Sequence, residues 1–180
     1  MERLNAVVLR LAVVAWIAVA VACQPGSTAA SGSSPNVAAP DPLNATYRIE
    51  KNDVTLVNGR SERDAPLGSA TKIVTTLADQ RATGDVDGDG RPDSVVVLMS
   101  QPGGSGTFFY IEALLNPASG VSAVPAVVLG DRIKVSSVRL DGRTIVVDIL
   151  DRAAGEPMIT APSVAVTKRF VVDAGALAGR

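Results

Sequence analysis

Short apolar runs alternate with turn-forming residues from residue 45 almost to the end of the chain. Many of the runs alternate apolar and polar positions, the period of a β-strand with one buried face. Asn58-Gly59 and Asp141-Gly142 stand between such runs and are typical of tight hairpin turns. The pattern predicts about nine strands and no amphipathic helix after residue 44, with the strands at 47–50, 54–57, 73–77, 94–99, 107–115, 126–129, 133–140, 144–150 and 163–172.

Turn signals recur roughly every 8–12 residues, which favours antiparallel pairing of neighbouring strands. We therefore expect a mainly β fold: a single antiparallel β-sandwich or barrel-like domain over residues 45–173, after a signal helix and a flexible tether. The apolar run 94–99 and the aromatic-rich run 107–115 are predicted to pair as a central hairpin. Residues 60–69 are polar and predict a loop, and residues 174–180 predict a frayed tail.

The N-terminus has the pattern of an export signal. Residues 1–22 combine two early arginines, an apolar run too short to span a bilayer and small residues at its end, which predicts a signal peptide. Cys23 follows at once and is the chain's single cysteine, so we predict that it is lipidated; the alternative is a secreted protein with a free thiol. Residues 23–44 are rich in Ser, Ala, Pro and Gly and predict a flexible linker.

One stretch concentrates acidic side chains. Asp85, Asp87, Asp89 and Asp93 stand at alternating positions in a glycine-rich stretch over residues 85–93, directly before the apolar run. Calcium takes six to eight oxygen ligands, and a loop that curls round the ion can supply them. We predict a structural Ca²⁺ site made by these four side chains and the backbone carbonyl of Arg91. The alternative is a plain solvent-exposed turn, because Asp-Gly pairs also make tight turns without an ion.

Composition excludes several function classes. The 180-residue chain has no histidine, which removes the commonest general base and transition-metal ligand. Its net charge is −1 and only 3% of its residues are aromatic. No basic patch or aromatic platform stands out, so nucleic acid is not an expected partner.

Several motifs together resemble an uncharacterised family of small bacterial lipoproteins. The resemblance rests on the GDxDGDGxPD loop at 84–93, the GGSGTFFY segment at 103–110, and shorter matches at 54–59, 129–133 and 155–158. It implies a β-domain in the cell envelope and transfers no catalytic residue. The loop itself is similar to the D-x-D-x-D-G-x-x-D calcium loops of FG-GAP (integrin-type) repeats, and it differs from an EF-hand because a strand follows it.

These features predict a non-enzymatic binding or structural module. We expect a lipoprotein anchored to a membrane by its N-terminal lipid, on the extracytoplasmic face of the cell envelope, with an envelope protein or glycan as partner. One alternative is an envelope glycan- or peptide-acting hydrolase that uses the carboxylates of Glu112, Glu156 or Asp148. Another is an inhibitor that plugs an envelope hydrolase with the loop at 101–106.

Overall fold

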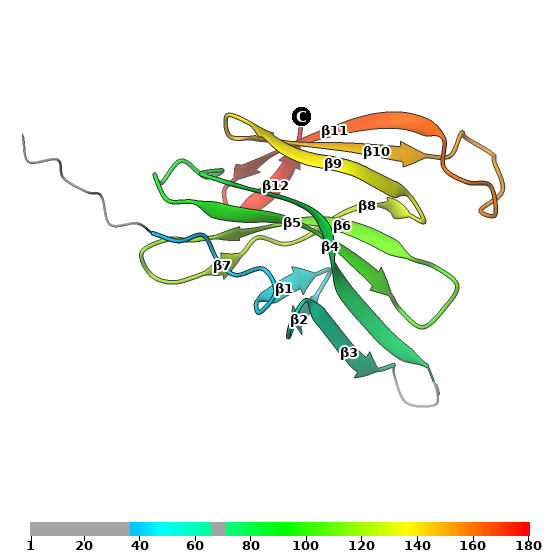
Figure 1. The fold of residues 1–180 in the computed structure, drawn as a ribbon, viewed down its shortest axis with the longest axis horizontal. Coiled ribbons are helices and arrows are strands. Elements are labelled where there is room, and N and C mark those ends of the chain that lie inside the picture. Colours follow the sequence, from blue (N-terminus) through cyan, green and yellow to red (C-terminus); the bar gives the residue numbers. More distant parts are fainter. Residues whose placement is uncertain (1–36, 66–70) are drawn as a thin grey trace, which may run out of the picture. The chain divides into compact units, whose positions relative to one another are not determined.

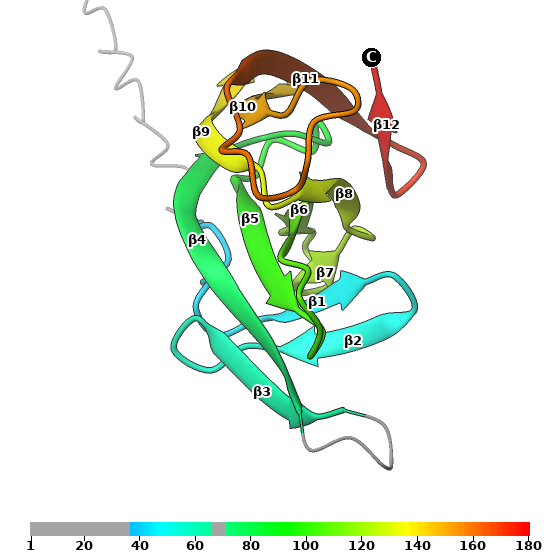
Figure 2. The same ribbon diagram turned by 90° about the vertical axis from the view of Figure 1, so that its right-hand side faces the viewer.

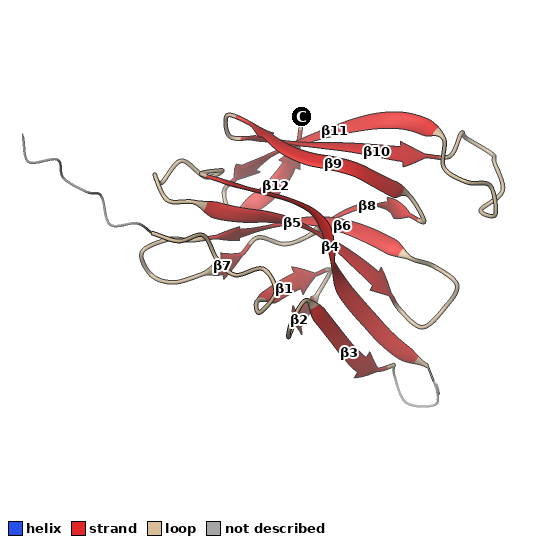
Figure 3. Ribbon diagram, viewed as in Figure 1, coloured by secondary structure: helices blue, strands red, loops and turns tan. Residues whose placement is uncertain are grey.

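The computed structural model describes residues 37–65 and 71–180. The signal peptide at 1–22 and the lipidation of Cys23 lie outside these residues. Twelve strands and no helix occur in the described part (Figure 3); accordingly, it contains no helix with the length and apolar character needed to cross a membrane. The strands are β1 (Thr46–Ile49), β2 (Asn52–Thr55), β3 (Arg60–Asp64), β4 (Lys72–Gly84), β5 (Asp93–Gln101), β6 (Phe108–Leu115), β7 (Ser122–Ala123), β8 (Val127–Asp131), β9 (Lys134–Asp141), β10 (Thr144–Asp151), β11 (Val164–Asp173) and β12 (Ala176–Gly179).

All strand pairs are antiparallel and form three sheets, which confirms the predicted mainly β fold. The six-stranded sheet has the order β3-β4-β5-β6-β7, with β8 also beside β6. The four-stranded sheet has the order β12-β11-β10-β9, and β1 and β2 form a separate hairpin. The four-stranded sheet covers one face of the six-stranded sheet, and the hairpin lies against the other face (Figure 1).

The six-stranded sheet is curled rather than flat. Its long strand β4 bends as it runs from the four-stranded sheet down to β3 (Figure 2). The β4–β5 register shifts between Leu77 and Arg81, so residues 78–80 have no partner on β5. Such an irregularity increases the local twist and lets one strand serve two differently oriented parts of a sheet.

Strand β5 separates two apolar clusters. Val95 and Val97 face the inter-sheet core, where residues of β10, β11 and β12 meet the six-stranded sheet. Val96 and Leu98 face the hairpin core, formed with Tyr47, Ile49, Val54, Leu56, Tyr110 and Leu114. All four β5 side chains are fully buried. Burial on both faces explains why this strand is a continuous apolar run instead of an alternating one.

The predicted hairpins are confirmed. Strands β5 and β6 pair from Ser94 opposite Leu114 to Ser100 opposite Phe108. Strands β9 and β10 pair from Asp141 opposite Thr144, so the two-residue turn is Gly142-Arg143, and Gly142 has a positive φ of 57°. A positive φ is the conformation that two-residue hairpin turns require.

Several segments differ from the sequence prediction: β7 was not expected, and β4 extends over Lys72–Gly84 where 73–77 was expected. Residues 60–64 were expected in a loop but form β3, an exposed edge strand paired with β4. The expected tail at 174–180 contains β12, which pairs with β11 and buries Leu177 in the inter-sheet core. The end of the expected linker is also held on the domain, because Ser94 Oγ donates a hydrogen bond to the Pro40 carbonyl (2.8 Å) and Asn116 Nδ2 donates one to the Ala38 carbonyl (2.8 Å).

Candidate functional site

The aspartate loop, residues 85–92, joins β4 to β5 within the six-stranded sheet. The pair Gly84–Asp93 closes its base. Val86 is fully buried in the inter-sheet core, so the loop is anchored by an apolar side chain. Gly88 and Gly90 have φ values of 88° and 80°. Glycine adopts this left-handed conformation without the strain other residues incur, so the loop can curl back on itself.

Three carboxylates converge in this loop. One oxygen each from Asp85, Asp87 and Asp89 lies within 4.8 Å of the others. The backbone holds these side chains in place: Asp85 accepts hydrogen bonds from the amides of Gly88 (2.6 Å) and Gly90 (2.9 Å). Asp87 accepts one from the Asp89 amide (3.1 Å), and Asp89 accepts one from the Arg91 amide (2.8 Å). The side chains are therefore positioned by the loop itself.

Asp85 favours its charged form. Burial, the largest single influence, opposes its ionisation, and the backbone amides of Gly88, Gly90 and Asp89 act against burial. Together with the nearby charge of Arg143 they lower the pKa of Asp85 below its ordinary value. A carboxylate oxygen that accepts one hydrogen bond still has a second lone pair for a cation.

Asp93 has a different place in the structure. It is fully buried, and its two oxygens accept hydrogen bonds from the amides of Val86 (2.9 Å) and Asn116 (3.0 Å). Its carboxylate is not among the three that converge. Burial raises the pKa of Asp93 above its ordinary value, and the charges of Asp87 and Asp89 act in the same direction. Asp93 thus ties the first turn of the loop to the end of β6.

Two further side chains, which sequence reasoning missed, hold the loop. Arg143, from the β9–β10 turn, donates hydrogen bonds to the backbone carbonyls of Val86 (3.4 Å) and Asp87. Asn116, directly after β6, donates one to the Pro92 carbonyl (3.2 Å). Both residues lie far along the chain from the loop carbonyls they contact, 24 residues for Asn116 and up to 57 for Arg143, so local sequence spacing could not reveal them. The side chain of Arg91 adds a further contact, because its Nε donates a hydrogen bond to the Asn116 carbonyl.

The loop could hold a metal ion. Three carboxylates offer hard oxygen ligands, which suit Mg²⁺, Ca²⁺ or Mn²⁺ better than softer metals. Like charges this close repel each other unless a cation or solvent screens them. The amide hydrogen bonds within the loop would also stabilise a plain turn without an ion. They are therefore compatible both with a calcium site and with a solvent-exposed turn.

The carboxylates considered for a hydrolase lie on separate parts of the domain. Glu112 is buried under the β1–β2 hairpin, where its Oε1 accepts a hydrogen bond from the Arg48 amide (2.7 Å). Asp148 points outward from the four-stranded sheet and accepts hydrogen bonds from Ser137 (2.8 Å) and Thr167 (2.6 Å). Glu156 is exposed in the β10–β11 loop and accepts one from the Ala153 amide (2.9 Å). These three residues do not form one site.

Glu112 is an unusual buried acid. Its Oε2 is buried and has no hydrogen-bond partner in the described chain. Burial raises the pKa of Glu112 to about 8, although the hydrogen bond from Arg48 and the charge of that residue lower it. A group with this pKa is largely protonated at neutral pH, which avoids an uncompensated buried charge.

No family model matches this chain, and no curated protein or solved structure matches it either. The resemblance to small bacterial lipoproteins therefore stays a prediction.

Proposed function

We propose that this protein is a lipid-anchored lipoprotein of the cell envelope whose β-domain is a non-enzymatic binding module stabilised by one calcium ion. The observation that carries the calcium proposal is the convergence of Asp85, Asp87 and Asp89 in a loop that contacts both large sheets. Val86 packs between the sheets, and Arg143 joins the loop to the β9–β10 turn. An ion bound there would hold the junction of the two sheets in its folded geometry.

The choice of calcium follows from the ligand type and the shape of the loop. Calcium accepts flexible oxygen geometry, whereas Mg²⁺ demands a near-ideal octahedron and keeps several waters. The Arg91 backbone carbonyl and water would complete the shell around the three carboxylates. Asp93, which sequence spacing assigned as a ligand, would instead support the site from below, because its two amide hydrogen bonds fix the base of the loop.

A binding role is supported by the placement of the acids. Glu112 and Asp148 lie on different sheets, and the fully buried Glu112 contacts no described cavity wide enough for a glycan or peptide. The inhibitor alternative would use the loop at 101–106 as a plug. This loop connects β5 to β6. Its Gly103 has a φ of 91°. The described residues thus favour a module that recognises a partner over one that cleaves it.

The calcium proposal is tested by melting the purified full chain in detergent, with calcium and then with chelator. At a calcium concentration 100 times the dissociation constant we expect the free energy of unfolding to rise by about 2.7 kcal/mol. The double substitution D87N/D89N should abolish the calcium dependence. The matched control is D79N, because Asp79 is an exposed acid on β4 outside the loop. Equal melting midpoints with calcium and with chelator would reject the structural ion.

The anchoring proposal is tested separately in cells. Wild-type protein should incorporate labelled palmitate and sediment with membranes, and the C23A variant should do neither. Palmitate incorporation into C23A, or a wild type found only in the soluble fraction, would contradict the lipidation of Cys23.

A further inference from the structure

The outward face of the four-stranded sheet carries a row of arginines. Val146 on β10 lies opposite Arg139 on β9 and opposite Arg169 on β11. The Arg180 amide donates a hydrogen bond to the Arg169 carbonyl (3.0 Å), which continues the β11–β12 register and sets these two arginines side by side. Side chains alternate between faces along each strand. Since Ile145, Val147 and Phe170 face the inter-sheet core, the row faces outward.

The burial of Val146 agrees with this arrangement. Its side chain is fully buried although it points away from the inter-sheet core. No described strand or loop covers this face of the sheet (Figures 1 and 2). The aliphatic stems of the flanking arginines are the neighbours that the register provides, and arginine stems commonly cover apolar surface while the guanidinium stays in solvent.

The row has one ion-pair partner within the described chain, Asp148, whose charge also attracts Arg169. Arg139 forms an ion pair with Asp148 (3.5 Å), whose oxygens also accept hydrogen bonds from Ser137 and Thr167. Arg169 and Arg180 form no ion pair with any described residue. Like charges directly opposite each other on neighbouring strands are destabilising. An anion placed between the two guanidinium groups would remove this repulsion.

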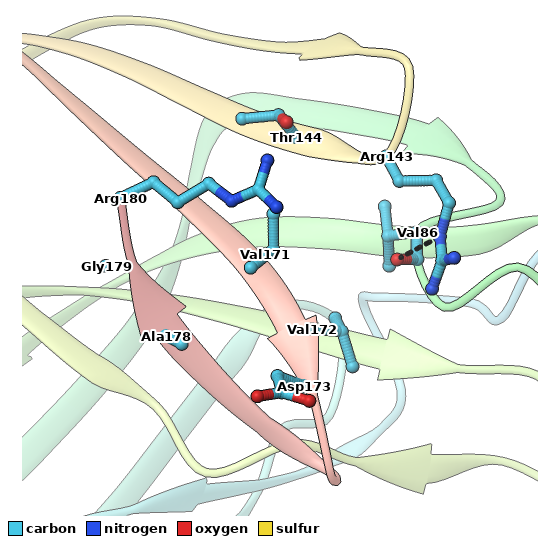
Figure 4. A pocket seen from close by; sticks show the side chains of 9 residues that line it. All are labelled: Val86, Arg143, Thr144, Val171, Val172, Asp173, Ala178, Gly179 and Arg180. Carbon is cyan, nitrogen blue, oxygen red and sulfur yellow. Dashed lines mark hydrogen bonds between the residues drawn. The ribbon is translucent and has the colours of Figure 1, made fainter.

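A cavity of about 580 Å³ adjoins the row at Arg180. Its lining has two arginines, Arg143 and Arg180, against one acid, Asp173, and valines form much of the remaining wall. Arg180 and Arg143 lie on two sides of the cavity with Thr144 near Arg180 (Figure 4). Because the Arg143 guanidinium is held by the Val86 and Asp87 carbonyls, Arg180 is the lining cation that remains for a ligand, beside an apolar surface.

We infer that Arg169 and Arg180, with the adjoining cavity, form a binding site for the phosphate group of an organic phosphate. The planar guanidinium fork matches the oxygens of a phosphate group, and two forks from neighbouring strands can engage one group together. The cavity is larger than a phosphate ion needs, and its valines suit the carbon part of a glycerol or sugar phosphate. The inference goes beyond the proposed calcium module and uses none of its ligand side chains.

The test is titration calorimetry on the full chain in non-ionic detergent, at constant low calcium and constant ionic strength. The probes are glycerol 3-phosphate, inorganic phosphate and glycerol. We expect saturable binding of glycerol 3-phosphate, weaker binding of inorganic phosphate and none of glycerol. The R169Q and R180Q variants should each lose roughly tenfold or more in affinity, about 1.4 kcal/mol. R63Q is the matched control, because Arg63 is an exposed arginine on β3.

A second arm distinguishes a free phosphate from a lipid headgroup. Phosphatidylcholine vesicles with and without phosphatidylglycerol are tested for sedimentation of the C23A protein, which lacks the proposed anchor. If the protein binds only the vesicles with phosphatidylglycerol, and R169Q abolishes this binding, the result would support the site. It would also identify a lipid headgroup as the source of the phosphate. R169K separates charge from fork geometry and should bind more weakly than wild type.

Two results would overturn the inference. One is the absence of saturable binding to all phosphate probes, which would mean that Asp173 and solvent suffice to neutralise the arginines. The other is binding that R169Q and R180Q leave unchanged, which would place the phosphate elsewhere. Far-ultraviolet circular dichroism checks that the variants are folded, and both residues are exposed. Because calcium is constant throughout, failure here is distinct from failure of the proposed ion site.

Discussion

Asp93 and Glu112 are two fully buried acids on neighbouring strands of one sheet, and the fold treats them differently. Both oxygens of Asp93 accept amide hydrogen bonds, from Val86 and Asn116. Only one oxygen of Glu112 has a partner, the Arg48 amide. Burial raises the pKa of both acids, but the two amide hydrogen bonds oppose the rise for Asp93, whereas Glu112 has one such bond and its pKa reaches about 8. The comparison teaches that burial alone does not decide how an acid responds to pH.

The largest expected effect comes from removing the Asp93 carboxylate. D93A leaves the amides of Val86 and Asn116 buried without partners, at about 1–3 kcal/mol each. We expect a loss of about 3 kcal/mol or more in the free energy of unfolding, measured by urea denaturation. The D93N control keeps one acceptor and the side-chain volume, and it should cost less. A D93A protein as stable as wild type would show that Asp93 does not tie the loop to β6.

The next prediction concerns the pH dependence that Glu112 imposes, which is small within any single pH unit. Its pKa is about 8 in the folded state and lies near 4.5 when unperturbed, so the folded state binds more protons between these values. Stability from this group is complete below about pH 4.5 and falls as the pH rises to 8, by at most about 1.4 kcal/mol per unit. Urea denaturation across this range should show a smaller decline for E112Q than for wild type. Parallel curves for the two proteins would assign the decline to other groups.

The smallest effect is expected for the R48A variant. Glu112 bonds to the backbone amide of Arg48, which the substitution keeps. The lost side-chain ion pair with Asp53 is exposed (3.4 Å) and contributes about 0–1 kcal/mol. Stability at acidic pH should therefore change little. Because the charge of Arg48 lowers the pKa of Glu112, the midpoint of the decline should move to higher pH in R48A. A large loss of stability at acidic pH would mean that the arginine side chain itself docks the hairpin.

Where strands bury apolar side chains, the sequence was enough to predict them. The run at 94–99 and its aromatic partner carry the apolar signal of β5 and β6. Strand β3 could not be found this way, because Arg60–Asp64 is polar and mostly exposed on a sheet edge. This strand forms because its backbone pairs with β4. Backbone pairing cannot be recognised from the spacing of apolar residues in the sequence. Strand β12 was missed for the same reason, since only Leu177 of its four residues is buried.

In the candidate site, too, local sequence spacing predicted some of the residues and missed others. Local spacing predicted that Asp85, Asp87 and Asp89 come together, because neighbouring positions in one tight loop share a small volume. Local spacing grouped Asp93 with them, although it faces inward and pairs with the Asn116 amide. Long-range neighbours such as Arg143 become known only once the two sheets are stacked. The row formed by Arg139, Arg169 and Arg180 likewise depends on the strand register.

The attachment of residues 38–40 has a mechanical consequence. The Ala38 carbonyl is held by Asn116, and the Pro40 carbonyl is held by Ser94, the residue after Asp93. Asn116 also contacts the Pro92 carbonyl and, through its amide, Asp93. Tension applied to the chain ahead of residue 38 is therefore transmitted first to the end of the aspartate loop. A cation bound in the loop would stiffen the segment that Asn116 and Ser94 connect to residues 38–40.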